Sequence, residues 1–283
     1  MYNLRYHITS LVAVFLALAV GLVLGALVVR QGAFDSQQHA LVTSLQSQFA
    51  KLKKDNAALK STIALQDPYA AQMTDDWVKG RLTGRSVVVL TSGGKNEGTD
   101  AAVSAVKAAG GTPVVVTILK PGLGLSTSSI ASATASVLGT ASGVPSNADV
   151  AKQLEAEWAG TNATRPLTTA LVNAGAMKVA GLSGSTIATQ AIDIAAFDGD
   201  PDPLALDIAQ AYASAGMFAL GAQAFGTDTG VAAAASARQL SAFDTLGTSA
   251  GRFTLVALFS GGQQGYYSVT ARGATPFPPV PKP

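Results

Sequence analysis

The chain has 283 residues, of which 13% are charged, and its formal net charge is +2. A net charge this small does not indicate a basic surface that could bind nucleic acid, so we predict no nucleic-acid partner. The chain contains no cysteine, which excludes disulfides, thiolate metal ligands and cysteine nucleophiles.

An uninterrupted apolar stretch at residues 8–29 opens the chain. As a helix it is long enough to cross the ~30 Å hydrocarbon core of a bilayer. The alternative is a cleaved signal peptide, since Ala17-Leu18-Ala19 has the form of a cleavage site, but this site lies in the middle of the apolar run rather than at its end. We therefore predict a single-pass anchor within residues 1–33. Because the N-terminal flank is short, we expect it to stay in the cytoplasm, with the remainder of the chain outside the plasma membrane.

Small residues recur at every fourth position of the apolar stretch, at Ala13, Ala17, Gly21 and Gly25. On a helix they share one face, and such faces allow membrane helices to approach closely. The spacing is also common by chance in membrane helices. We predict this face as the surface through which two membrane helices pack.

A heptad pattern follows the anchor, and we predict a coiled-coil stalk at residues 34–67. Leucine at d positions, with asparagine at one a position, favours a parallel two-stranded coil. The alternative is an amphipathic helix that packs on its own domain, because the pattern is short for a coiled coil. Asp67-Pro68 is predicted to end the helix, since the residue before proline avoids the α conformation. The predicted homodimer interface consists of Val42, Leu45, Phe49, Leu52, Asn56, Leu59 and Ile63.

From Arg85 onward, runs of β-branched residues alternate with helical segments. This alternation predicts an α/β layer fold with a mostly parallel sheet flanked by helices, a Rossmann-like domain at residues 85–272. Segment 122–143 is predicted to be a loop around a loose helix, and the proline-rich tail at 273–283 is predicted to be extended and disordered. Strands are predicted at 86–91, 112–119, 178–182, 191–197, 217–222 and 239–243, and helices at 99–109, 147–158, 166–174, 204–215 and 251–259.

The string from Gly247 to Gly251 matches G-x-S-x-G, the nucleophile elbow of serine hydrolases. A hydrolase of this kind needs a histidine to take the hydroxyl proton. The chain has only His7, beside the anchor, and His39, at the start of the stalk. We therefore interpret the string as the end of a strand followed by Ser249 as the N-cap of a helix.

Two further strings resemble ligand loops. The turn at 93–98 lies between a strand and a helix, where phosphates bind, but it fits neither the dinucleotide nor the Walker spacing. Asp198, Asp200 and Asp202 alternate as in a calcium loop, but prolines and the missing distal glutamate break that pattern. We interpret the first string as a glycine turn and the second as a solvated turn that caps the next helix.

The sequence therefore predicts no catalytic residues, no bound cofactor and no enzymatic activity. A soft metal such as Cu(I) prefers Cys, Met and His ligands. The two histidines and four methionines of the chain share no ligand spacing, so the sequence assigns no metal ligand.

The N-terminal string at residues 3–8, followed by the apolar run at 11–21, closely resembles the actinobacterial MctB family, named for copper transport. The resemblance continues through the stalk, the strand at 87–90, and the late stretches at 243–252 and 262–267. Family members often show His-Tyr-Gly where this chain has Tyr266-Tyr267-Ser268.

The resemblance implies a role in copper efflux or homeostasis at a mycobacterial-type outer membrane. The related SteB group implies instead a cell-division scaffold that works with a SteA-like membrane partner and influences peptidoglycan hydrolases. A transmembrane barrel needs many alternating strands without helical layers, whereas this chain shows one spanning helix and an α/β pattern. The residues therefore favour a membrane tether, and a pore would require an unusual assembly of several copies.

Overall fold

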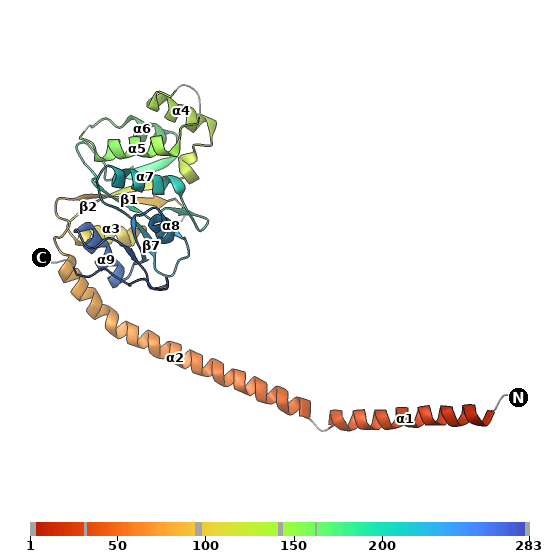
Figure 1. Ribbon diagram of the computed structural model, residues 1–283. Coiled ribbons are helices and arrows are strands. Elements are labelled where there is room, and N and C mark those ends of the chain that lie inside the picture. The colour runs from red at the N-terminus through yellow and green to blue at the C-terminus, as the bar shows by residue number, and fades with distance from the viewer. Residues whose placement is uncertain (1–3, 31–32, 94–97, 141–143, 162, 281–283) are drawn as a thin grey trace. The chain divides into compact units, whose positions relative to one another are not determined.

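The computed structural model describes residues 4–30, 33–93, 98–140, 144–161 and 163–280, with the side chains at 4–5, 28–38, 40 and 59–67 outside the description. The chain divides into two compact units, Met1–Gln66 and Asp67–Pro283, which are described separately (Figure 1).

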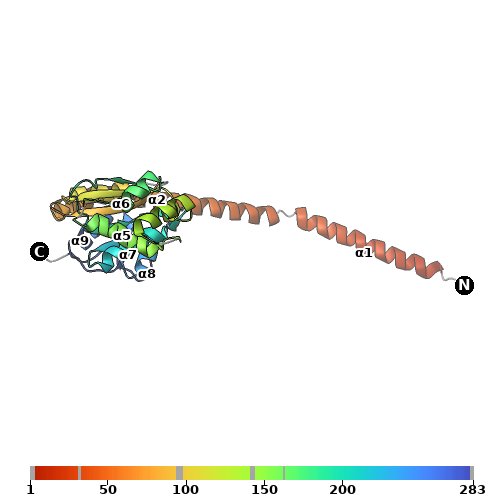
Figure 2. The same cartoon turned by 90° about the horizontal axis from the view of Figure 1, so that it is seen from above.

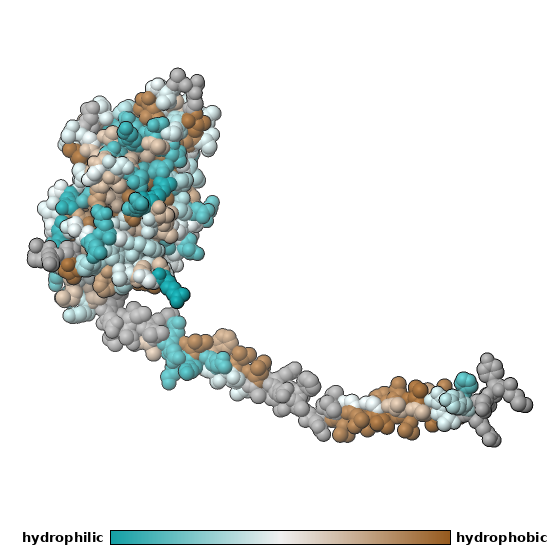
Figure 3. Space-filling view, viewed as in Figure 1, coloured by the Kyte–Doolittle hydropathy of each residue, from teal (hydrophilic) through white to brown (hydrophobic). Residues whose placement is uncertain are grey.

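The first unit contains helix α1 (Leu4–Arg30) and most of helix α2 (Ala33–Val78). Within α1, the segment Tyr6–Leu27 is long and apolar enough to cross a membrane, and none of it is buried. It is the single segment of this kind in the described part of the chain. Figure 3 shows apolar side chains covering this helix. The expected N-terminal apolar helix is therefore present.

Helix α2 runs through Pro68 and ends at Val78, so the predicted helix end at Asp67-Pro68 is wrong. A proline inside a helix removes one backbone hydrogen bond and crowds the carbonyl four residues earlier, here that of Ala64. It does not remove the helical bonds on either side. The helix therefore continues past the proline into a segment that tertiary contacts stabilise.

Those contacts lie in the last turns of α2, which belong to the second unit. The ring of Trp77 packs 4.6 Å from that of Phe253, and Asp75 pairs with Arg252. The guanidinium of Arg81 lies 3.9 Å from the centre of the Trp77 ring. The first two of these contacts join the end of α2 to helix α9 (Ser249–Phe259).

The second unit is a mixed α/β domain around a seven-stranded sheet, as far as the structure describes it, with the order β3-β2-β1-β4-β7-β8-β9. Every neighbouring pair is parallel except β2 and β3, which are antiparallel. The predicted α/β class with a mostly parallel sheet is confirmed. The strands of this sheet are β1 (Ser86–Ser92), β2 (Thr112–Ile118), β3 (Met177–Ala180), β4 (Gln190–Asp193), β7 (Ala219–Ala224), β8 (Ser241–Leu246) and β9 (Tyr266–Tyr267).

Helices cover both faces of the sheet (Figures 1 and 2). Side chains alternate along β1: Val87 and Val89 belong to the core beneath α3 and α9, whereas Val88 and Leu90 belong to the core beneath α5, α6 and α7. A strand that is buried on both faces consists of a nearly continuous run of apolar residues, and β1 has such a run. The remaining helices are α3 (Thr99–Ala108), α4 (Ser128–Leu138), α5 (Asn147–Ala159), α6 (Pro166–Asn173), α7 (Pro203–Ser214), α8 (Val231–Ala237) and the 3₁₀ helix η1 (Pro121–Gly124).

Several boundaries differ from the prediction. Strand β4 ends at Asp193 instead of continuing to residue 197, because the Asp193 carboxylate accepts the N–H of Ala195 and turns the backbone. The next residues form a separate short ladder of β5 (Ala196–Phe197) and β6 (Asp200–Pro201). Segment 122–143 contains the regular helix α4 rather than a loose one, and α8 is a helix that the sequence did not predict.

The proline-rich tail also differs from the prediction of disorder as far as residue 280. The chain bends at residues 276 and 277, and the ring of Phe277 lies 6.2 Å from that of Phe253, edge to face. Pro278 is buried. Phe277 and Pro278 are therefore packed on the domain, and residues 281–283 lie outside the description.

Candidate functional site

The predicted packing face of α1 is exposed along its length. Ala13, Ala17, Gly21 and Gly25 are all exposed, and a Cβ added at either glycine would meet no atom within 4 Å outside its own helix. Close approach of a second helix at this face therefore requires no rearrangement of the described part of α1.

The predicted stalk stripe is exposed as well. The exposed fractions are 49% for Val42, 45% for Leu45, 69% for Phe49 and 64% for Leu52. Asn56 is also exposed, and the side chains of Leu59 and Ile63 lie outside the description. Figure 3 shows apolar patches on α2. Apart from Asn56, the described members of the stripe are therefore large apolar side chains left exposed.

The nucleophile-elbow string has a structural explanation. The N-cap of α9 is Thr248, whose hydroxyl accepts the N–H of Gly251 at 3.0 Å. Ser249 is the first residue of the helix, so the predicted cap is displaced by one residue. A Cβ at Gly251 would lie 2.0 Å from the carbonyl oxygen of Thr245, so this position admits only glycine.

The acidic string at 198–202 contains a helix cap, as predicted. One oxygen of Asp202 accepts the N–H groups of Leu204 and Ala205 at 2.9 and 3.1 Å, at the start of α7. Its other oxygen accepts the N–H of Gly122 at 2.8 Å, which joins η1 to α7. The Asp202 side chain is buried rather than solvated, with 2% exposed.

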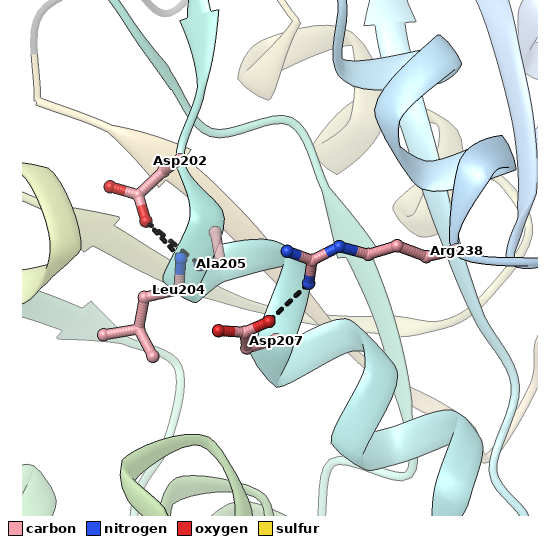
Figure 4. A network of polar contacts seen from close by, with 5 residues as sticks. All are labelled: Asp202, Leu204, Ala205, Asp207 and Arg238. Carbon is pink, nitrogen blue, oxygen red and sulfur yellow. Dashed lines mark hydrogen bonds and ion pairs between the residues drawn. The ribbon is translucent and has the colours of Figure 1, made fainter. Parts of the chain in front are cut away.

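Figure 4 shows this cap beside the ion pair between Asp207 and Arg238. Asp198 and Asp200 are exposed. Within the described residues, no three His, Cys, Asp or Glu side chains come together in a way that could hold a metal ion.

Asp193 is a buried acid that sequence reasoning missed. Its side chain is fully buried, one oxygen accepts the N–H of Ala195 at 2.9 Å, and the other has no hydrogen-bond partner in the structure as described. Burial raises the pKa of Asp193 to about 8, with smaller opposing effects from the Ala195 hydrogen bond and Arg238 and a further rise from Asp202. The carboxyl is therefore mainly protonated at neutral pH.

A cavity of about 480 Å³ lies where β1, β4 and β7 end. Its lining includes Ser92 at the end of β1, Ile194 after β4, and Gln223 in β7. Gly98, immediately before α3, also lines it, whereas residues 94–97 of the predicted glycine turn lie outside the description. No local sequence pattern indicates this cavity, because its walls come from segments that are far apart in the chain.

The cavity lies where the strand order of the sheet changes direction. The chain passes from β1 to β2 on one side, while β4 and then β7 lie on the other side of β1. In open α/β sheets, ligands bind outside the carboxyl ends of the strands at such a switch point. The cavity is thus the part of the domain where this fold class places a ligand.

These features define a mixed α/β protein with an N-terminal apolar helix. The sequence matches the family model described as "Copper transport outer membrane protein, MctB" over residues 1–279, and the chain therefore belongs to the MctB family.

Curated relatives match a smaller region. The copper transporters MctB of Mycobacterium bovis and Mycobacterium tuberculosis are each 34% identical to the chain over 125 residues, which cover 42% of this chain and 37% of each relative. The match thus spans little more than a third of the length of these relatives. No solved structure matches the chain.

Proposed function

We propose that this protein is a non-enzymatic, membrane-anchored protein of the cell envelope that acts in copper efflux or homeostasis. The match to the copper-transport family over residues 1–279 carries the proposal, and the single apolar helix Tyr6–Leu27 supports membrane association. Copper is the cargo in this proposal, and no residue of the chain is assigned as its ligand.

Deletion of the gene tests this function directly. We expect higher cellular copper and greater copper sensitivity, measured by elemental analysis and growth inhibition, with normal levels restored by the full chain. Zinc and manganese contents serve as the control and should not change. Normal copper content in the deletion strain, at copper concentrations that stress the parent, would contradict the proposal.

We place the N-terminus in the cytoplasm and the α/β domain outside the plasma membrane, whereas the family description names an outer membrane. Because the chain contains no cysteine, single-cysteine variants can report this topology. Asp200→Cys, at an exposed position of the domain, should react with a membrane-impermeant maleimide in intact cells. Tyr6→Cys, at the start of the apolar segment, should react only after the cells are opened. The reverse pattern would contradict this orientation.

A second candidate is a homodimeric scaffold for cell division, with a parallel coiled coil and Rossmann-like domains that recruit a SteA-like membrane partner or envelope hydrolases. The exposed stripe on α2, which includes Val42, Leu45, Phe49 and Leu52, favours it. The sheet order also supports the Rossmann-like interpretation, apart from the antiparallel β3.

A pull-down from membranes with the full chain separates the two candidates when the same sample is analysed for metal. Recovery of a division protein or a peptidoglycan hydrolase without copper supports the scaffold. Recovery of copper without such partners supports the copper function.

A further inference from the structure

We propose that the cavity at the carboxyl ends of β1, β4 and β7 binds an uncharged saccharide. This inference goes beyond the copper function and does not depend on it. The volume of about 480 Å³ falls within the range of about 300–1,000 Å³ that small-molecule sites occupy. The switch-point position is where an α/β sheet of this kind presents a ligand to several loops at once.

The described lining residues offer no cationic partner for phosphates. Asp198 is the one charged side chain among the described lining residues, and they contribute no Lys or Arg. Phosphate groups are bound through cationic side chains or converging N–H donors, and a lining carboxylate repels them. The described lining therefore offers no cationic partner to a nucleotide, although the position of the cavity is typical of nucleotide sites.

The described lining residues also lack a set of metal ligands. Hard cations such as Ca²⁺ take six or more oxygen ligands, often several carboxylates, and Asp198 is the sole carboxylate here as far as the structure describes the lining. Copper(I) prefers sulfur and imidazole, and the described lining contains no Met, Cys or His. The described part of the lining is thus suited to a neutral molecule.

The remaining groups match a molecule that carries several hydroxyls. Asp198 offers a carboxylate that accepts O–H donors, and the hydroxyls of Ser92 and Thr229 can donate or accept. Phe197 contributes a half-buried aromatic ring to the wall. Phe225, which follows the lining residue Ala224, has 58% of its surface exposed.

A sugar ring has a hydroxyl edge and a C–H face, and this lining has a counterpart for each. The carboxylate and hydroxyls can bond the edge, while an aromatic ring packs against the apolar face. The small residues Gly98, Ala196 and Gly199 leave the space in which the ring would lie.

The test uses the full chain in detergent and two probes, N-acetylglucosamine and trehalose, with binding measured by saturation-transfer NMR and calorimetry. We expect saturable binding of at least one sugar, and at least tenfold weaker binding by Asp198→Asn. Asp198 has a φ of 51°, a left-handed conformation that Asn also tolerates, so this variant should keep the fold. Thr229→Val, which removes a hydroxyl at similar volume, should weaken binding independently.

Asp200→Asn is the matched control. Asp200 is also exposed and lies two residues after Asp198, at the start of β6, but it is not part of the described lining, so its variant should bind as the parent does. Three results would overturn the proposal: no saturable binding of either sugar by the folded chain, equal loss in the Asp198 and Asp200 variants, or saturable binding of ATP or NAD⁺ that excludes the sugars.

Discussion

The carboxylate of Glu157 in α5 accepts two hydrogen bonds from Thr168 in the first turn of α6, from its N–H at 2.8 Å and from its hydroxyl at 2.7 Å. The other carboxylate oxygen accepts the N–H of Leu167 at 2.7 Å. The N-cap residue of α6, Arg165, makes no side-chain capping bond. A buried side chain from another helix therefore caps α6, and its negative charge lies where the helix dipole favours one.

Glu157→Gln should destabilise the domain by about 1–3 kcal/mol, because the amide replaces an acceptor with a donor that faces other donors. Urea or thermal unfolding of the full chain measures this loss. The control is Glu155→Gln on the same helix. Burial already raises the pKa of Glu155 and disfavours its charge, so this change should cost much less. Equal losses in the two variants would show that Glu157 is not a cap.

Gly251→Ala should destabilise the domain by about 1–3 kcal/mol or more, as overpacking does, because the new Cβ would meet the carbonyl oxygen of Thr245 at 2.0 Å. Gly265→Ala is the control, since its Cβ would meet its nearest neighbour, the hydroxyl of Tyr267, at an ordinary 3.5 Å. Thermal unfolding of both variants distinguishes them. If the two glycines tolerate alanine equally, close packing does not explain the glycine at the end of the G-x-S-x-G string.

Local sequence patterns predicted the first part of the domain well. Strand β1, helix α3 and strand β2 lie within a residue of their predicted limits, because a β-branched run and Gly110-Gly111 determine them locally. Helix α5 begins at the predicted residue, since Ser146 accepts the N–H of Asp149 as its cap. These elements carry their start and stop signals in adjacent residues.

The errors occur where tertiary contacts or distant residues decide the structure. Pro68 is a local signal for a helix end, but contacts between Trp77 and Phe253 stabilise the helix beyond it. Helix α8 is nearly all alanine and lacks the apolar periodicity of an amphipathic helix. The cavity combines Ser92, Ile194 and Gln223, which only the strand order brings together, so no single stretch of sequence could indicate it.

The coiled-coil proposal predicts that Leu45→Ser together with Leu52→Ser converts a dimer into a monomer, because a dimer interface at a and d positions would lose two buried leucines. Sedimentation or chemical crosslinking of the full chain in detergent measures the change. Leu41→Ser is the matched control: Leu41 is 65% exposed on the same helix but lies off the a and d stripe, so its variant should remain dimeric. A parent chain that is monomeric at high concentration would exclude the dimer.

Asp193 makes the stability of the domain depend on pH in a direction opposite to that of a salt-bridged acid. Its pKa is about 8 in the folded chain, mainly because of burial, and about 3.9 in the unfolded chain. Between these values the folded state binds one more proton than the unfolded state, so stability falls as the pH rises and levels off above about pH 8. Within this pH range the free energy of unfolding decreases by up to about 1.4 kcal/mol per pH unit.

Urea unfolding of the full chain should therefore give a free energy of unfolding that is lower at pH 7 than at pH 5, and this group should account for about 2–3 kcal/mol of the decrease. Asp193→Asn keeps the acceptor for the N–H of Ala195 but cannot ionise, so its stability should change less over the same range. Both proteins share the other titrating groups, so the contribution of those groups cancels when the two changes in the free energy of unfolding are compared. If the two proteins lose stability equally between pH 5 and pH 7, Asp193 is not protonated in the folded chain, and the side chain must have a partner or access to water.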